Sequence, residues 1–200
     1  MDQQILTDVH RYWFGELKSP TDAPPPEKMQ LWFRPTEEID NHIHETFGHH
    51  LDDAKATEWY LPALSREEQV GLVVLLDQFP RQIFRHSAQS FAYDAKAKAI
   101  ANLFLEGGLH RFYPVERTFI ILPLEHSEDI ADQDRCVLLF AAEAVAAPEP
   151  AKAGTRKDLD FATKHRDIIR KFGRFPHRNA LLGRESTPEE LEFLKGGRGF

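Results

Sequence analysis

Apolar residues recur at helical spacing along nearly the whole chain. Residues 5–14 form the first such segment, and Gly15 follows it as a typical stop signal. Residues 70–76 are apolar on every side, as in a helix buried at the centre of a fold, and we expect them in the core together with residues 137–141. No segment alternates as a half-buried strand does, and no repeat period is present. The pattern predicts an all-α fold.

Capping residues and helix breakers delimit the other predicted helices. Ser65 and Glu68 form a capping box before the buried segment, and Pro80 is expected to end or kink that helix. Ser127 is expected to cap a long helix that Pro148 and Pro150 close. Further helices are expected over residues 36–51, 91–105, 114–122 and 157–171 and from Thr187 onward, with a proline-rich loop over residues 18–27. These segments predict a compact array of seven to nine antiparallel helices.

Composition and charge narrow the class of protein. The 200 residues are 42% hydrophobic and 28% charged, an ordinary globular mix, so we expect a single domain over residues 1–200. The net charge of -7 argues against a protein that binds nucleic acid or an anionic membrane. No apolar run, residues 72–76 among them, approaches the roughly 20 residues of a membrane span. The first residues lack the basic start of a signal peptide, so we expect a soluble, cytoplasmic protein.

Metal-ligating residue types occur, but their spacing matches no known site. Cys136 is the single cysteine, which excludes an intramolecular disulfide and a multi-cysteine zinc site. His42, Glu45 and His49 share one helical face and could hold a metal loosely. The His-Glu-x-x-His pattern that begins at His44, however, would need its second histidine one residue earlier. We therefore expect a solvated polar face, no tightly bound structural metal and no cofactor.

A carboxylate follows the buried apolar segment directly. Asp77 stands at the C-terminal end of that helix, where burial and the helix dipole both disfavour an unpaired negative charge. Arg81 or Arg85 is its expected partner. Such a pair is commonly structural, but Asp77 and Arg81 are also candidate ligand contacts.

The second candidate segment is acidic. Residues 125–134 contain five carboxylates before any basic residue, with Glu125 and Asp129 one helical turn apart and His126 beside Glu125. Carboxylates with a histidine can bind a divalent ion or carry out acid–base chemistry. They are equally typical of a helix N-terminus, which the helix dipole makes favourable for acids. Both interpretations stay open.

The third segment has the opposite charge. Residues 156–184 contain nine lysines or arginines against three acids, a local charge of +6 in an acidic protein. His165 and Arg166 lie on its predicted helix; Arg174, His177 and Arg178 follow on a loop. Because the guanidinium fork suits carboxylate and phosphate, the cluster is a candidate anion clamp, or it pairs with the acidic segment. We expect the two segments to meet, the excess arginines to form the ligand site, and the phenylalanines of the loop to pack inward.

Several motifs of the chain resemble one bacterial family. They are Leu-Asp-Gln-Phe-Pro-Arg at 76–81, Leu-Glu-His-Ser-Glu-Asp at 124–129, His-Arg-Asp-Ile-Ile at 165–169, Phe-Gly-Arg-Phe-Pro-His-Arg-Asn at 172–179 and Leu-Gly-Arg-Glu-Ser-Thr-Pro-Glu-Glu at 182–190. The chain is similar, over most of its length, to the domain-of-unknown-function family DUF924, placed in the tetratricopeptide-repeat-like helical superfamily. The resemblance implies packed antiparallel helical hairpins and no established reaction. The tetratricopeptide consensus is not visible, so peptide binding would be carried over by analogy alone.

Three functions are compatible with these segments. The first is binding of an anionic small molecule or an acidic peptide end, with Arg166, Arg174, His177 and Arg178 as contacts and Glu125, His126 and Asp129 on the facing wall. The second is a hydrolase or transferase with His126 or His165 as general base and Glu125 orienting it, although no nucleophile, P-loop or dinucleotide motif is present. The third is a helical interaction scaffold. A closed polar pocket would favour the first two and an open aromatic groove the third.

Overall fold

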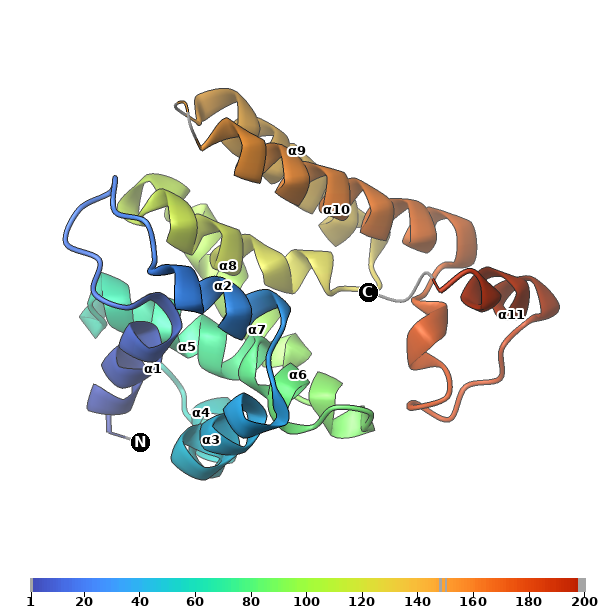
Figure 1. The fold of residues 1–200 in the computed structure, drawn as a ribbon, viewed down its shortest axis with the longest axis horizontal. Coiled ribbons are helices and arrows are strands. Elements are labelled where there is room, and N and C mark those ends of the chain that lie inside the picture. The colour runs from blue at the N-terminus through green and yellow to red at the C-terminus, as the bar shows by residue number, and fades with distance from the viewer. Residues whose placement is uncertain (1, 148, 150, 198–200) are drawn as a thin grey trace. The chain divides into compact units, whose positions relative to one another are not determined.

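The computed structural model describes residues 2–147, 149 and 151–197, and within these ranges it is helical and contains no strand (Figure 1). The α-helices are α1 (Gln4–Phe14), α2 (Pro26–Phe33), α3 (Glu37–Phe47), α4 (Leu51–Ala56), α5 (Arg66–Asp77), α6 (Phe79–Ile83), α7 (Asp94–Glu106), α8 (Pro114–Glu125), α9 (Ile130–Ala146), α10 (Lys152–Phe172) and α11 (Pro188–Lys195). Short 3-10 helices are η1 (Gly48–His50), η2 (Leu61–Ala63), η3 (Ala88–Phe91), η4 (Leu109–Arg111) and η5 (Pro176–Arg178). Nine of the α-helices have eight or more residues, which confirms the predicted all-α class and number.

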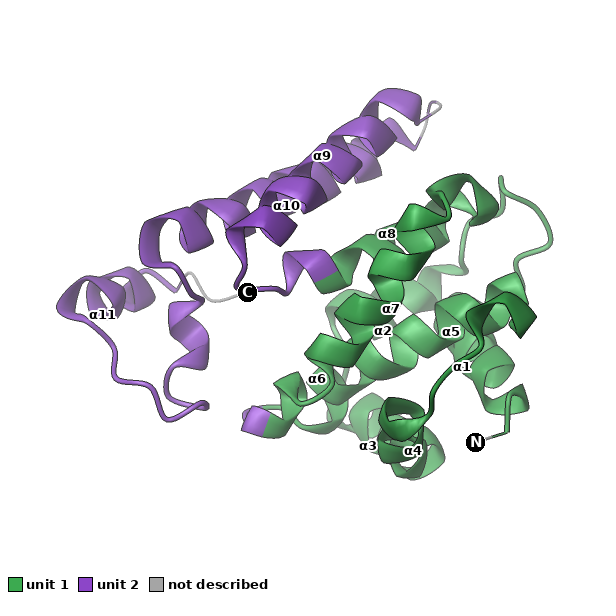
Figure 2. Cartoon of the chain, turned by 180° about the vertical axis from the view of Figure 1, so that it is seen from behind, with its two compact units in different colours: residues 1–85, 89–123 green, residues 86–88, 124–200 purple. Residues whose placement is uncertain are grey.

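The described residues form two compact units (Figure 2). Unit 1 contains residues 1–85 and 89–123, and unit 2 contains residues 86–88 and 124–200. The single domain expected over residues 1–200 stays a prediction, because two compact units can belong to one domain. No described helix is both long enough and apolar enough to cross a membrane.

Unit 1 is built around α5, whose residues 70–76 are all buried, as predicted. Gly71 lets α1 approach α5 very closely, because a Cβ built on Gly71 would lie 2.0 Å from the carbonyl oxygen of Leu6. Aromatic rings pack beside this contact: the Phe119 ring lies 4.9 Å from the Trp32 ring and 5.2 Å from the Phe14 ring. This close backbone contact and ring packing belong to the core of unit 1, to which α3, α4 and α7 also contribute buried apolar side chains.

Most local start and stop signals act as expected. Ser65 accepts a hydrogen bond from the Glu68 N–H at 3.2 Å, and the Glu68 carboxylate accepts from the Ser65 N–H at 2.6 Å, so the capping box is present. α5 ends at Asp77, three residues before Pro80. The loop expected at residues 18–27 gives way to α2 at Pro26, a helix that sequence patterns did not predict; proline is tolerated there because the first N–H of a helix needs no internal acceptor.

Unit 2 contains the helical pair α9 and α10, which lie side by side in both views (Figures 1 and 2). Two expectations for α9 are wrong. Its cap is Asp129, which accepts from the Ala131 N–H at 2.8 Å, rather than Ser127. Residues 137–141 are not all in the core: Phe140 is buried, but Leu138 is 71% exposed, because α10 covers only one face of α9. The predicted closing residues Pro148 and Pro150 lie outside the described residues.

Candidate functional site

The loop after α10 is the starting point of the site. α10 ends at Phe172 and is capped by Gly173, whose backbone is left-handed with φ of 69°, a conformation that glycine adopts without the strain of a Cβ. The chain then turns through Phe175 into η5. Phe175 and Pro176 are buried, so the loop packs inward as expected, while Phe172 is half-buried against the Phe193 ring at 5.1 Å.

The buried ring of Phe175 gathers three side chains that can carry positive charge. The Arg178 guanidinium lies over it, with Cζ 4.6 Å from the ring centroid. The imidazole of His177 is 5.5 Å away and that of His165, on α10, is 5.6 Å away. We call Phe175, His165, His177 and Arg178 the Phe175 cluster. A carboxylate adjoins it, since Glu125 Oε1 lies 3.5 Å from His165 Nδ1.

His165 is held in one orientation and in its neutral form. Its Nδ1 lies 2.9 Å from the carbonyl oxygen of Phe161, so Nδ1 carries the proton and donates it, and Nε2 is the acceptor nitrogen. Burial lowers the pKa of His165 to about 3, and the neighbouring charges of His126, His177 and Arg178 act in the same direction. The imidazole is therefore a neutral base at physiological pH.

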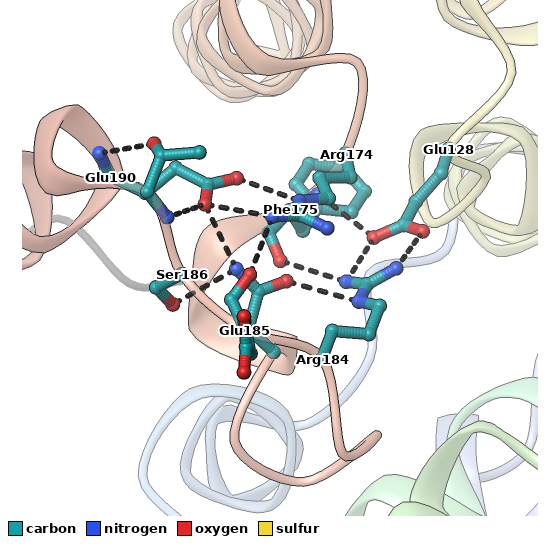
Figure 3. Close-up of polar contacts among 9 residues, drawn as sticks. Glu128, Arg174, Phe175, Arg184, Glu185, Ser186 and Glu190 are labelled. Atoms are coloured by element: carbon teal, nitrogen blue, oxygen red, sulfur yellow. Dashed lines mark hydrogen bonds and ion pairs between the residues drawn. The ribbon is translucent and has the colours of Figure 1, made fainter.

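An ion pair clamps the backbone of Phe175 (Figure 3). Glu128 accepts a hydrogen bond from the Phe175 N–H at 2.8 Å and pairs with Arg184 at 2.6 and 2.9 Å. Arg184 also donates to the Phe175 carbonyl at 3.2 Å. Burial alone would raise the pKa of Glu128, but the hydrogen bonds from Arg184 and Phe175 and the charge of Arg178 outweigh it and lower that pKa. Sequence patterns did not single out Glu128 or Arg184, although both lie inside the charged segments.

A second ion pair holds the other side of the loop. Arg174 donates two hydrogen bonds to Glu190, at 2.7 and 2.9 Å, and a third to the carbonyl of Glu185 at 2.8 Å (Figure 3). Glu190 also accepts from the Thr187 N–H and from Asn179. These contacts, the Arg174 hydrogen bond first, lower the pKa of Glu190 to about 2. The guanidinium of Arg174, a predicted anion contact, is thus occupied by protein groups.

The acidic and basic segments meet, as predicted. Asp134 pairs with Arg170 at 2.6 Å and lies 3.9 Å from Arg166, which also reaches Asp167 at 3.4 Å. Of the sequence-predicted site residues in unit 2, Glu125, His126, His177 and Arg178 surround His165. Asp129 is exposed and caps α9.

The other two predicted contacts, Asp77 and Arg81, belong to unit 1. Arg81 Nη1 lies 3.5 Å from Asp77 and 2.9 Å from Asp94, and the side-chain amide of Gln78 donates to Asp77 at 2.6 Å. Burial opposes the charge of Arg81, yet Asp77 and Asp94 bring its pKa above the ordinary value. Arg81 is therefore the partner of Asp77, whereas Arg85 pairs with Asp40 on α3.

Glu116 is a buried charged residue that the sequence analysis did not identify. Glu116, on α8, has no exposed surface; it lies 2.6 Å from His10 Nε2, pairs with Arg66 and accepts from the Tyr113 N–H at 2.7 Å. Burial would raise the pKa of Glu116, but these hydrogen bonds lower it. The available signal was His10, which continues the apolar stripe of α1 four residues after Leu6.

Metal-ligating side chains do not converge in the described part of the chain. His42 and His49 are exposed, α3 ends at Phe47 between them, and the His49 ring instead lies 3.8 Å from that of His50. No group of three or more His, Cys, Asp or Glu side chains among the described residues is arranged to hold an ion. Cys136 is buried, and burial raises the pKa of its thiol, with Glu125 and Asp132 adding to the effect.

Comparison with known proteins places the chain in a family. A solved structure, described as a protein of unknown function, ATU0120, from Agrobacterium tumefaciens, superposes with a TM-score of 0.76 at 32% sequence identity, over 98% of this chain and 99% of that one. Among curated proteins, none matches. The family model described as "Bacterial protein of unknown function (DUF924)" matches residues 9–198. The chain therefore belongs to the DUF924 family.

Proposed function

We propose that the Phe175 cluster binds a small anion that carries a carboxylate or phosphate group. The observation that supports this is the convergence of Arg178 and His177 on one buried ring, 4.6 and 5.5 Å from its centroid, beside the neutral imidazole of His165. A guanidinium donates two parallel hydrogen bonds to such a group, and a ring N–H of His177 beside it can donate one more. A buried setting strengthens these bonds relative to water.

The ion pairs described above suit this function because they fix the backbone of the loop that carries His177 and Arg178. Glu128 and Arg184 hold the backbone of Phe175 at both its N–H and its carbonyl. A binding site works best when its contacts are positioned before the ligand arrives. Glu125, beside His165, would orient the imidazole.

Titration of anions against thermal unfolding tests the proposal. Phosphate, acetate and a short peptide with a free or amidated C-terminus would each be added at constant ionic strength. An anion at a 100-fold excess over its dissociation constant is expected to stabilise the protein by about 2.7 kcal/mol. The stabilisation should be lost in Arg178→Ala and kept in Arg170→Ala, which removes an exposed guanidinium of the same segment.

If Arg178→Ala does not fold, His177→Gln serves as the second variant, because His177 is only half-buried. Comparing the two peptides shows whether the site takes a peptide C-terminus or only a free small anion. If it takes a peptide end, the peptide with the free C-terminus should bind and the amidated peptide should bind more weakly. Absence of a shift with every anion would contradict the proposal.

An acid–base enzyme acting on an anionic substrate is the second candidate, and one observation favours it. The carbonyl of Phe161 fixes the proton of His165 on Nδ1, so Nε2 of the ring carries the lone pair that an acid–base step would use. Turnover of nitrophenyl phosphates or nitrophenyl esters by the protein, lost in His165→Gln while anion stabilisation persists, would support this function. Equal rates in both proteins would contradict it.

A further inference from the structure

Two adjoining hollows open on the surface of unit 1, beside α2 and α3. The first has a volume of about 780 Å³ and is lined by α3, Tyr12 and Gln30; the second, of about 570 Å³, is lined by Met29, Gln30, Phe33 and Arg34. Gln30 belongs to both, so the hollows adjoin along α2. Their volumes fall within the usual range of ligand sites, roughly 300–1,000 Å³.

The second hollow presents apolar side chains to solvent. Met29 is 51% and Phe33 68% exposed, and the two lie one helical turn apart on the same side of α2. α2 is anchored through its other side, where Leu31 is buried and Trp32 Nε1 donates to the carbonyl of Trp13 at 3.1 Å. Met29 and Phe33 therefore do not help to pack α2 against the core.

The first hollow is acidic. Glu37, Glu38 and Glu45 line it, and none of the three takes part in a hydrogen bond or ion pair with another described side chain. Asp40, on the same helix, does pair with Arg85. Glu37 and Glu38 lie in the first turn of α3, where the helix dipole favours acids, and Glu45 lies near the other end of the helix, so the three carboxylates place negative charge along the length of this hollow.

We infer that these two hollows together dock a basic peptide segment of a partner protein, with a large apolar side chain on Met29 and Phe33 and lysines or arginines facing Glu37, Glu38 and Glu45. Charge complementarity selects this occupant: the acidic hollow would repel an acidic segment, and an uncharged apolar segment would leave the carboxylates unmatched. Two cations of the chain also lie at this surface: the Lys28 ammonium, 5.2 Å from the Tyr12 ring centroid, and Arg34, which lines the second hollow, so the peptide's lysines or arginines face the three glutamates of α3 and not Tyr12 or α2.

A labelled synthetic peptide in which lysine alternates with leucine is the probe, and fluorescence anisotropy with the full chain is the measurement. Glu45→Lys is expected to weaken binding about fivefold or more, since it replaces attraction by repulsion. Glu45 lies in the last turn of α3, where the helix dipole favours a cation, so the variant should fold. Glu106→Lys on α7 is the matched control, with the same charge change at an exposed, unpaired position outside the hollows, and should bind as the original chain does.

The apolar half of the surface has its own pair of variants. Phe33→Ser should weaken the same peptide by a similar factor, while Leu103→Ser, at another exposed apolar position, should not. A lysine–serine peptide and a glutamate–leucine peptide should both bind more weakly than the lysine–leucine probe. Equal binding of all three peptides, or equal loss in variants and controls, would overturn the inference. Self-association of the free protein that Glu45→Lys abolishes would overturn it in favour of a second copy of the chain.

Discussion

Unit 1 and unit 2 are each stabilised internally by a different kind of interaction. Unit 1 contains most of the buried apolar side chains of the described residues, and α5 contacts α1, α4, α6 and α7. Unit 2 contributes Leu124, Cys136, Phe140, Ala162, Ile168, Ile169 and Phe175 to the buried apolar set. Its segment from Gly173 to Thr187 is instead positioned by two ion pairs and their hydrogen bonds.

The difference follows from what each segment has to position. Helices present a continuous apolar face, so packing alone can align them. The segment after α10 has few apolar side chains, and η5 is its one short helix within the described residues. Directional hydrogen bonds, accepted by Glu128 and donated by Arg184 and Arg174, therefore determine where Phe175 and its neighbours lie. A volume change should damage unit 1 first, and a change of charge or pH should damage unit 2 first.

A single methyl group added to a glycine should give the largest contrast between the units. Gly71→Ala places a Cβ 2.0 Å from the Leu6 carbonyl oxygen, and backbone cannot move aside as a flexible side chain can. We expect a loss of about 4 kcal/mol or more in the free energy of unfolding, above the usual cost of overpacking. Gly154→Ala on α10 meets nothing within 4 Å and should stabilise the protein by about 0.5–1 kcal/mol. Urea denaturation of both variants measures the difference; similar effects would contradict the close approach of α1 and α5.

Shortening a leucine should show the same contrast in milder form. Leu75→Ala leaves a cavity in the buried part of α5 and should cost about 2–5 kcal/mol. Leu138→Ala on α9 removes a side chain that is mostly in solvent and should change stability by less than about 0.5 kcal/mol. Thermal and urea unfolding of the two variants provide the values. A large effect at Leu138 would mean that the outer face of α9 is covered in solution.

The ion pairs of unit 2 should respond to pH. The pKa of Glu190 is about 2 in the folded protein against an ordinary 4.5, so its contribution to stability is complete above about pH 4.5 and is lost as the pH falls towards 2. Glu190→Gln should cost about 1.5–3 kcal/mol at pH 7, because a charge-assisted bond to Arg174 is lost, and progressively less in acid. Glu192→Gln, at an exposed ion pair, is the control and should cost less than about 1 kcal/mol at every pH.

His165 should give the smallest effect and one at a different pH. Its pKa is about 3 when folded and 6.5 ordinarily, so the unfolded chain takes up a proton that the folded chain does not. Stability from this group is complete above pH 6.5 and falls with decreasing pH, by at most about 1.4 kcal/mol per pH unit. When the pH falls from 7 to 5.5, the free energy of unfolding of His165→Gln should therefore decrease by about 1 kcal/mol less than that of the original chain. Parallel pH profiles of the two proteins would show that His165 is not buried in its neutral form.

Sequence patterns correctly predicted structural features that are formed by residues close together in the chain. The capping boxes at Ser65–Glu68 and Thr187–Glu190 are formed by residues three apart, and both are present. The exposure of Leu138 could not be predicted this way, because it depends on which face α10 covers. The charged segments were predicted to meet, but their pairing was not: Arg184 lies 56 positions from Glu128, and one-dimensional charge counts do not distinguish it from Arg174 or Arg178.

Burial of the single thiol has a practical consequence for labelling chemistry. Only the thiolate of a cysteine attacks a maleimide, and the raised pKa of Cys136 together with its burial keeps that thiol protonated and inaccessible. The natural chain is therefore a suitable background for attaching one fluorophore or spin label without first removing a cysteine. A cysteine introduced at Phe33 would carry the label on the α2 surface, and one introduced at Leu182 would carry it on the loop that follows η5.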